Sequence, residues 1–369
     1  MKPDLIRPEI ATLPTYNAGL ALDRFQALYG TRCRAKLDSN ENPLGPCHGA
    51  VEAIRAEAAG IARYPDAGNA ALRAELAEAT GATPDRIIIG NGSEDLIGAL
   101  FRTVLRPGDH LVTVCPSFGL HEFGARACGA HVTKVPFAPD WSFPLDGLTR
   151  AMAAEAPRVL IFSSPSNPAG PAITEAEFDG LLKATPADTL VVFDEAYLEY
   201  LDAARRFDAM ARLAAGPNPW ITLRTFSKAY GLAGVRVGYG IACTPELVAQ
   251  MMKARNPFGV NALAVAAARA ALRDPGHLAR SVALAAGERA RLAEGLGRAG
   301  HACAPSQTNF VFFDTGQTAT DLSEALRHQG VLIKPWLEAP FTTWARVTVG
   351  TTEENDIFLA AVSTLRRAA

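Results

Sequence analysis

Short apolar runs alternate with helix-like stretches over the first two-thirds of the chain. The runs are four or five residues long and mostly apolar, and they lie at residues 86–89, 111–114, 158–162, 190–193 and 220–223. Helix-like stretches such as residues 96–104 and 175–184 separate some of them. Near-continuous apolar strands that alternate with helices are typical of a mostly parallel sheet covered on both faces. The pattern therefore predicts a large α/β domain over residues 45–245.

The pattern changes after residue 245. Two Ala-rich helical stretches, residues 246–273 and 275–299, are followed by strand-like segments at 310–313, 331–333 and 346–349 and by a last helix at 353–367. Alanine enrichment by itself says only that these stretches form helices well. Strands set apart from helices at one end of a chain predict a smaller α+β domain.

Length and charge exclude several classes of protein. The chain has 369 residues, more than one hydrophobic core usually supports, which again predicts two domains. Its net charge of −2 offers no basic surplus for nucleic acid. We expect no signal peptide, because the first residues are charged and lack an apolar run. We also expect no membrane span, because the least polar stretch, residues 259–268, is too short to cross a bilayer.

The cysteines indicate a reducing compartment. They are scattered and contain no C-x-x-C pair; they are Cys33, Cys47, Cys115, Cys128, Cys243 and Cys303. Such spacing supports neither a zinc site nor a disulfide framework. We therefore expect reduced cysteines, no bound metal and a cytoplasmic location.

Polar residues follow four of the predicted strands. Residues 90–94 (GNGSE) follow the first, 163–170 (SSPSNPAG) the third, 194–197 (DEAY) the fourth and 225–228 (TFSK) the fifth. The carboxyl ends of parallel strands meet at one edge of a sheet, where such folds bind ligands. The sequence therefore predicts one site built from these four segments.

Seven stretches together resemble the fold-type-I aminotransferases that depend on pyridoxal phosphate (PLP), and among them most closely the histidinol-phosphate aminotransferases. They are residues 37–46 (LDSNENPLGP), 63–66 (RYPD), 91–94 (NGSE), 164–170 (SPSNPAG), 193–197 (FDEAY), 225–236 (TFSKAYGLAGVR) and 346–351 (RVTVGT). The resemblance covers essentially the whole chain. It implies amino-group transfer between an amino acid and a 2-oxo acid, a homodimer with shared active sites, and a small domain made of residues 1–44 and 246–369.

Lys228 is the residue on which this interpretation depends. A lysine forms a Schiff base with an aldehyde cofactor only when its amine is deprotonated, which a cationic and partly desolvated site promotes. Ser227 and Arg236 lie near it in the sequence. The alternative is a surface lysine that follows a strand.

The resemblance also implies contacts to the cofactor ring. Asp194 ends an apolar strand, and a buried carboxylate there would pair with the pyridinium nitrogen; its alternative role is a helix N-cap. Asn167 and Tyr197 would hydrogen-bond the phenolic oxygen, although Asn167 could be only a turn residue. Phe118 would stack on the ring, or else belong to the core.

The cofactor phosphate needs hydrogen-bond donors and positive charge. Residues 92–94 open a predicted helix, whose N-terminal N–H groups favour an anion. The residues expected around the phosphate are Gly92, Ser93, Glu94, Thr225, Ser227 and Arg236. By resemblance, Tyr64 reaches this phosphate from the neighbouring subunit.

The expected substrate contacts include one departure from the resembled family. Arg346 matches the arginine that grips the substrate's α-carboxylate, and Tyr16 and Asn42 match residues near the substrate. Where histidinol-phosphate enzymes commonly carry a second arginine, this chain has Lys334, followed by Pro335 and Trp336. A lysine holds a phosphate as a point charge but not bidentately. Trp336, with Trp344 and Phe341, could instead line an aromatic pocket, so histidinol phosphate and an aromatic amino acid both remain as donors.

Three rival functions remain to be weighed. A dinucleotide-binding module is disfavoured because Asp95 stands where the third glycine of the fingerprint belongs. A metal hydrolase is disfavoured because His121 and Glu122 lack the second histidine of that motif. A PLP decarboxylase or lyase would share every cofactor contact, and the sequence does not separate it from an aminotransferase.

Overall fold

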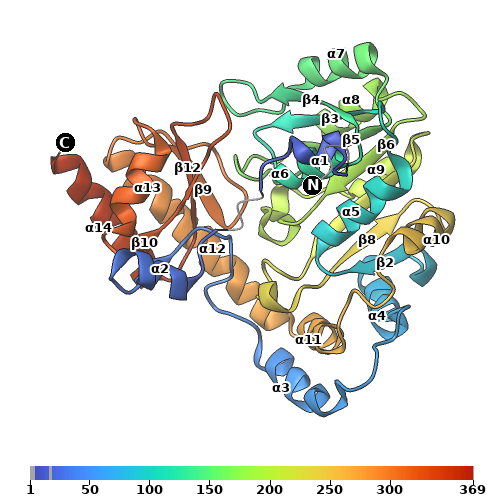
Figure 1. The fold of residues 1–369 in the computed structure, drawn as a ribbon, viewed down its shortest axis with the longest axis horizontal. Helices are drawn as coiled ribbons and strands as arrows, with labels where there is room; N and C mark the ends of the chain where they lie inside the picture. Colours follow the sequence, from blue (N-terminus) through green and yellow to red (C-terminus); the bar gives the residue numbers. More distant parts are fainter. Residues whose placement is uncertain (1–4, 16–18, 369) are drawn as a thin grey trace.

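The computed structural model describes residues 5–15 and 19–368. They form two lobes (Figure 1). The large lobe is built on a seven-stranded sheet, and the small lobe on a three-stranded sheet with a two-stranded ribbon. Within this described part, no helix is both long enough and apolar enough to span a membrane.

The large sheet has the strand order β2-β8-β7-β6-β5-β3-β4. Its strands are β2 (Ile87–Gly90), β3 (His110–Cys115), β4 (His131–Pro136), β5 (Val159–Ser163), β6 (Leu190–Asp194), β7 (Trp220–Thr225) and β8 (Gly238–Ala242). β8 runs antiparallel to its neighbours β2 and β7, and the remaining pairs are parallel. The predicted mostly parallel sheet is therefore confirmed.

Both faces of this sheet are buried. In β5, Leu160 and Phe162 enter one hydrophobic cluster, whereas Val159 and Ile161 enter another. Because side chains alternate across a strand, a continuous apolar strand needs cover on both faces. Helices of the first cluster are α3 (His48–Glu57), α4 (Ala70–Thr80), α7 (Leu145–Glu155), α8 (Glu175–Ala184), α9 (Ala209–Ala215) and α11 (Ala262–Leu272). Those of the second are α5 (Ser93–Val104), α6 (Gly119–Ala127) and α10 (Pro245–Ala254).

The small lobe has an antiparallel sheet of order β11-β12-β9. Its strands are β9 (Phe310–Asp314), β11 (Lys334–Pro335) and β12 (Trp344–Thr348), and the parallel ribbon pairs β1 (Ala35–Lys36) with β10 (Val331–Leu332). Helices α13 (Ala319–Arg327) and α14 (Thr352–Ala368) cover it. Helix α2 (Leu22–Tyr29) joins this lobe, because the Tyr29 hydroxyl donates to Glu324 at 2.9 Å.

Helix α12 (Pro275–Arg298) connects the lobes (Figure 1). Near its start it packs beside Tyr197 through Leu278 and Ala285, and near its end Leu292 and Leu296 enter the small-lobe core. Helices α10 and α11, which precede it, pack on the large sheet. The sequence predicts the domain boundary at residue 245, and we propose to draw it between α11 and α12.

The N-terminal segment is divided between the lobes. Helix α1 (Pro8–Ala11) lies against α6, and Arg7 Nη2 donates to the Ala127 carbonyl at 2.6 Å. Figure 1 shows α1 in front of the large sheet, away from α2. The prediction that residues 1–44 group with the small domain therefore fits α2 and β1 but does not fit α1.

Several elements differ from the predicted ones for local reasons. The helix predicted at 246–273 is interrupted between Ala254 and Ala262, where Asn261 caps α11 by accepting from the Ala264 N–H at 2.8 Å. Pro257 and Gly259 lie in the gap and disfavour a continuous helix. Strands β4 and β8 were not predicted. The remaining short 3₁₀ helices are η1 (Ala58–Gly60), η2 (Pro84–Arg86), η3 (Leu198–Tyr200), η4 (Ala203–Arg205) and η5 (Ala233–Val235).

Candidate active site

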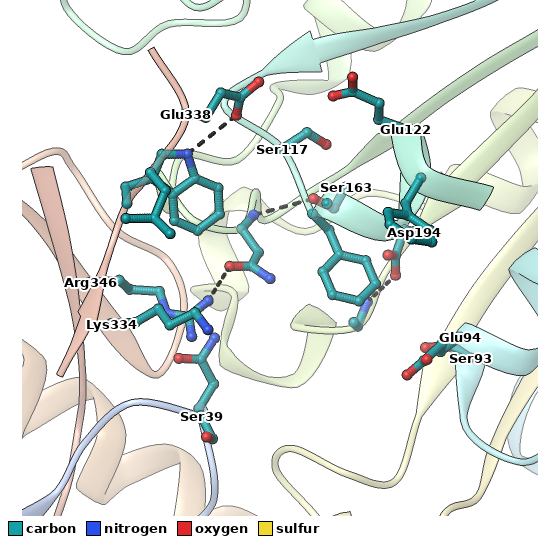
Figure 2. A pocket seen from close by; sticks show the side chains of 18 of the residues that line it. Ser39, Ser93, Glu94, Ser117, Glu122, Ser163, Asp194, Lys334, Glu338 and Arg346 are labelled. Carbon is teal, nitrogen blue, oxygen red and sulfur yellow. Dashed lines mark hydrogen bonds between the residues drawn. The ribbon is translucent and has the colours of Figure 1, made fainter. Parts of the chain in front are cut away.

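A cavity of about 1300 Å³ lies at the carboxyl ends of the central parallel strands and is closed on its other side by β11 and β12. Figure 2 shows Ser93 and Glu94 at one end of it and Glu338 at the other. Most of the residues predicted for the site line this cavity: Ser93, Glu94, Phe118, Asn167, Asp194, Tyr197, Thr225, Ser227, Lys228, Arg236, Lys334, Trp336 and Arg346. Gly92 adjoins it beside Ser93.

The sheet register explains why segments distant in sequence meet here. β5 ends at Ser163, which pairs with Asp194 at the end of β6, and β7 ends at Thr225. β5 and β6 are apolar up to their last residues, Ser163 and Asp194, whereas β7 also carries Thr222 and Arg224. Because the three strands are parallel, the polar residues at their carboxyl ends lie at the same edge of the sheet. Asn167 and Lys228 follow within a few residues.

Lys228 is partly buried between cations. Its Nζ lies 3.4 Å from the Ser39 carbonyl oxygen and 5.9 Å from the centre of the Tyr197 ring. Burial, and then the positive charges of Arg346 and Arg236, lower its pKa to about 8. About a tenth of the amine is therefore uncharged at neutral pH and able to act as a nucleophile or base.

Arg236 and the start of α5 form an anion-binding corner. Gly92 has φ +85°, and Ser93 begins α5. The first N–H groups of this helix have no partner within the helix and can bind an anion. Arg236 Nη1 donates to Ser227 Oγ at 3.2 Å, and its Nη2 lies 3.7 Å from Glu94. A Cβ on Gly92 would lie 2.4 Å from Arg236 Nη2, so only glycine allows this approach.

Asp194 is held by a buried histidine that the sequence analysis considered only as a metal ligand. His121 Nε2 lies 3.2 Å from Asp194 Oδ2, and its Nδ1 lies 3.1 Å from Ser117 Oγ. Because a carboxylate only accepts hydrogen bonds, Nε2 is the donor. The Ala196 N–H donates to the other carboxylate oxygen at 3.1 Å. Its role could have been suspected from the sequence because His121 follows Phe118, the residue predicted to stack on the cofactor ring, by three positions.

Asn40 is a second residue that was not singled out. It is fully buried with φ +55°, and its Nδ2 donates to the Tyr197 hydroxyl at 2.8 Å. Its backbone N–H donates to Thr348 Oγ1 at 2.9 Å, and its carbonyl accepts from Asn309 at 3.0 Å. These bonds fix Tyr197 relative to the small lobe.

Arg346 joins the two lobes at the cavity wall. Its Nη1 donates to Asn167 Oδ1 at 2.6 Å (Figure 2), and its Nη2 donates to the Asp38 carbonyl at 2.8 Å. Its guanidinium lies 5.3 Å from the centre of the Phe310 ring. The planar guanidinium is therefore fixed in position, and such a group can bind a carboxylate with two parallel hydrogen bonds.

Lys334 lies beside Arg346, since the two residues are paired across β11 and β12. Burial, and then the positive charge of Arg346, lower the pKa of Lys334 to about 8. Trp336, two residues further, lines the same cavity. A cation and an aromatic ring thus meet in this part of the wall.

Besides Gly92, two predicted residues that the structure describes do not line the cavity. Asn42 binds the Ala229 carbonyl and Ser281 Oγ, both at 2.9 Å, and so ties its loop to α12. Its predicted contact with substrate is replaced by this structural one. Tyr64 is 83% exposed and stacks on Phe258 with ring centres 4.6 Å apart. Tyr16 lies outside the described residues.

Comparison with known proteins gives consistent matches over the whole chain. Residues 35–362 match the family model for aminotransferase class I and II. Histidinol-phosphate aminotransferase 1 of Mesorhizobium japonicum is 43% identical over 98% of this chain and 98% of that protein. Histidinol-phosphate aminotransferase 3 of Rhizobium meliloti is 44% identical over 97% of this chain and 96% of that protein.

The solved structures agree. The crystal structure of histidinol-phosphate aminotransferase from Sinorhizobium meliloti in complex with pyridoxal-5'-phosphate has a TM-score of 0.90 and 31% identity to this chain. It covers 99% of this chain, and 98% of that chain is covered in turn. This likeness confirms the fold class predicted from the sequence.

Proposed function

Because the chain belongs to the class I and II aminotransferases, we propose that it is a histidinol-phosphate aminotransferase that works with PLP held by Lys228. The observation that carries the proposal is that Lys228, Asp194 and Arg346 line one cavity. An amino-group donor and a 2-oxo acid acceptor would use this cavity in turn, with glutamate and 2-oxoglutarate as the second pair. The names of the relatives support the donor.

The anion corner fits the phosphate of PLP. The first N–H groups of α5 and the guanidinium of Arg236 offer donors and positive charge, and the hydroxyls of Ser227 and Thr225 line the same cavity. The glycine at residue 92 leaves room for this arrangement, since a Cβ there would collide with Arg236. We assign these residues to the phosphate.

The part of the cavity next to the anion corner fits the pyridine ring of PLP. Asp194 is almost fully buried and offers a carboxylate to the ring nitrogen, and Phe118 lines the cavity near His121. Asn167 and Tyr197 offer the hydrogen-bonding groups expected for the phenolic oxygen. When bound, the protonated ring withdraws electrons from the bonds to the substrate's Cα, which no side chain can do.

Lys228 is the proposed catalytic base as well as the cofactor anchor. Its Nζ takes the proton from the substrate's Cα, and the lowered pKa keeps a useful fraction of the amine unprotonated. The same choice of base serves both halves of the transamination, because the proton taken from one substrate is returned to the next.

Arg346 and Lys334 are the proposed binding site for the acidic group of each substrate. Histidinol phosphate carries a phosphate ester where an amino acid carries its α-carboxylate. Arg346 would take either group bidentately, and Lys334 would add a point charge for the larger phosphate. The ring of the donor would then extend toward Trp336.

An aromatic amino-acid aminotransferase is the second candidate, and the observation that favours it is Trp336 in the cavity wall. The discriminating experiment measures the half-reaction of the PLP form with histidinol phosphate, phenylalanine, tyrosine and glutamate by absorbance. We expect histidinol phosphate to react with the highest kcat/KM of the ring-bearing donors. Faster reaction of phenylalanine or tyrosine would replace the first candidate by the second.

The variant Lys334→Ala refines this test. If Lys334 binds the phosphate, its loss should lower kcat/KM for histidinol phosphate by roughly ten- to a hundredfold, as expected for about 1.5–3 kcal/mol of a hydrogen bond to a charged group. Turnover of phenylalanine should stay within about threefold, because Arg346 alone can hold a carboxylate. Unchanged kinetics with histidinol phosphate would remove Lys334 from the substrate site. A parent enzyme that shows no absorbance from bound PLP would refute the proposal that the protein is a PLP-dependent aminotransferase.

We further propose a homodimer in which Tyr64 completes the active site of the partner subunit. Tyr64 and Phe258 form an exposed aromatic pair on the large lobe, and Tyr64 does not line the cavity of its own chain. Exposed aromatic residues of this kind are common in protein interfaces. We also propose a cytoplasmic location, which is supported by six cysteines that are all unpaired.

A further inference from the structure

The loop between β11 and β12 carries a carboxylate that reaches from the small lobe to the large lobe. Glu338 Oε1 accepts from Lys134 Nζ at 2.7 Å and from Cys115 Sγ at 3.4 Å. Its other oxygen accepts from the Trp336 indole N–H at 3.3 Å (Figure 2). Lys134 lies on β4 and Cys115 ends β3, so one side chain of the loop is bound to two strands of the large sheet.

Lys134 is itself held from the large-lobe side. Its Nζ donates to Glu122 Oε2 on α6 at 2.9 Å, and Glu122 also accepts from Arg126 at 2.7 Å. One ammonium group therefore separates two carboxylates. The side chains of Lys134, Glu122 and Glu338 are 31%, 27% and 25% exposed, so solvent screens this pair less than a fully exposed one. Burial alone would lower the pKa of Lys134, but its hydrogen bonds to Glu338 and Glu122 outweigh burial and raise it.

The base of the loop is fixed differently from its tip. Trp344 packs against Phe312 with ring centres 5.1 Å apart and against Trp141 at 4.7 Å. At the tip, Leu337 is 60% exposed, and its neighbours Trp336 and Glu338 line the cavity. Apolar packing thus holds the base and extends to Trp336, whose ring centre lies 6.0 Å from that of Phe312, while the contacts of Glu338 hold the tip and the indole N–H.

We propose that Lys134 is a positioning residue for the substrate side of the cavity. Its ion pair with Glu338, which lies at the end of the cavity opposite Ser93 and Glu94 (Figure 2), holds the Trp336 indole as part of the cavity wall. The Trp336 indole contacts the ring of an amino donor. The Lys134–Glu338 ion pair thereby sets the affinity of the enzyme for donors that carry a ring. The assignment of the ring to this end rests on the proposed function, whereas the holding of the loop does not.

The holding of the loop is tested by amide hydrogen exchange on the enzyme as purified, a measurement that does not depend on PLP being bound. Lys134→Met removes the ammonium, Lys134→Arg keeps a cation, and Glu338→Gln removes the charge while keeping an acceptor for the indole. We expect exchange of residues 336–343 to become roughly five- to tenfold faster in Lys134→Met and Glu338→Gln, and to stay near the parent in Lys134→Arg. Lys183→Met, which removes an exposed lysine of α8, is the matched control and should leave the loop unchanged.

The kinetic part of the test compares donors with and without a ring. In Lys134→Met we expect KM for histidinol phosphate and phenylalanine to rise about five- to tenfold, with kcat nearly unchanged and KM for glutamate within about twofold. Lys134→Arg should restore both KM values. An equal rise for glutamate, or no rise for either ring-bearing donor, would overturn the selectivity role.

The two proposals fail in different ways. If the parent binds no PLP or transfers no amino group, the proposed function fails, while the exchange of residues 336–343 still decides whether the ion pair holds the loop. If the parent is an active aminotransferase and the loop exchanges at the same rate in every variant, the positioning role of Lys134 is refuted and the proposed function stands.

Discussion

Two features of its surroundings lower the pKa of Lys228. It lies within the electrostatic influence of Arg346 and Arg236, and it is also removed from water. Both effects disfavour the ammonium form, so protonation of the side chain at neutral pH releases less free energy than in an exposed lysine. The two arginines therefore serve twice, because they also offer positive charge to the anionic groups of cofactor and substrate.

This arrangement predicts the pH dependence of cofactor attachment. Attachment requires the neutral amine, so its rate should rise about tenfold per pH unit below pH 8 and level off above it, because the pKa of Lys228 is lowered to about 8. Replacing Arg346 by glutamine removes one of the charges that lower this pKa, and should move the midpoint to higher pH. Stopped-flow absorbance of the apoenzyme mixed with PLP measures both. A midpoint that falls in Arg346→Gln would contradict this account of the pKa.

The hydrogen bond from His121 predicts a graded loss when Asp194 is altered. Asp194→Ala should lower kcat by orders of magnitude while PLP still binds, because the ring nitrogen loses its partner. His121→Phe keeps Asp194 and removes its donor to Oδ2, together with the contact to Ser117 Oγ. We therefore expect a loss of roughly ten- to a hundredfold, the equivalent of about 1.5–3 kcal/mol. The ratio of kcat values and the absorbance maximum of the bound cofactor check this. A kcat in His121→Phe equal to that of the parent would reduce the histidine to a packing residue.

A functional residue can be predicted from the sequence when it directly follows an apolar strand. It cannot be predicted when its role depends on a partner that is distant in the sequence. Asp194 and Lys228 were predicted because apolar strands end beside them. His121 was missed as a partner of Asp194, since no local pattern relates residues 73 positions apart. Asn42 was placed in the substrate site by motif alone, whereas its amide is used to hold the loop against α12.

At the scale of elements, the same reasoning separates the strands that were predicted from those that were not. β5 and β6 are buried on both faces and apolar up to their last residues, so their sequences predict buried strands. β8 contains Gly238 and Gly240, because a Cβ on Gly238 would lie 2.5 Å from the Ser93 N. β4 lies at the sheet edge, where His131 is exposed and Lys134 partly so, and the apolar signal is lost there.

The turn from β2 into α5 predicts a position that accepts only glycine. Gly92→Ala would force a side chain into φ +85° and toward Arg236, and should cost about 1–3 kcal/mol of stability. Because Arg236 must move, PLP affinity should fall by at least about tenfold. Thermal unfolding and PLP titration measure the two effects. Gly180→Ala, in the exposed middle of α8 with open space around it, is the control and should keep or slightly raise stability. Equal behaviour of the two variants would refute the special role of Gly92.

At the scale of the whole molecule, the cavity depends on both lobes keeping their relative position. The large lobe offers Lys228, Asp194 and the anion corner, while the small lobe offers Arg346 and Lys334. Arg346 donates to Asn167 across this boundary, and Asn40 donates to Tyr197. Some of the hydrogen bonds that join the lobes therefore involve side chains that we assign to the substrate or the cofactor, namely Arg346, Asn167 and Tyr197.

The proposed sharing of active sites predicts that two defective subunits complement each other. Lys228→Ala removes the anchor of its own site, and Tyr64→Phe removes a hydroxyl from the site of the partner subunit. In a heterodimer of the two variants, one site carries both defects and the other carries neither, so activity should rise toward about half that of the parent per heterodimer. Differently tagged subunits, co-expressed and purified through both tags, give this heterodimer directly. Tyr64→Phe homodimers must first show a weaker affinity for PLP, because the exposed hydroxyl would otherwise have no function to restore. Activity no higher than that of the two homodimers would mean that each subunit builds its site alone, and that the Tyr64–Phe258 pair serves only to hold the dimer together.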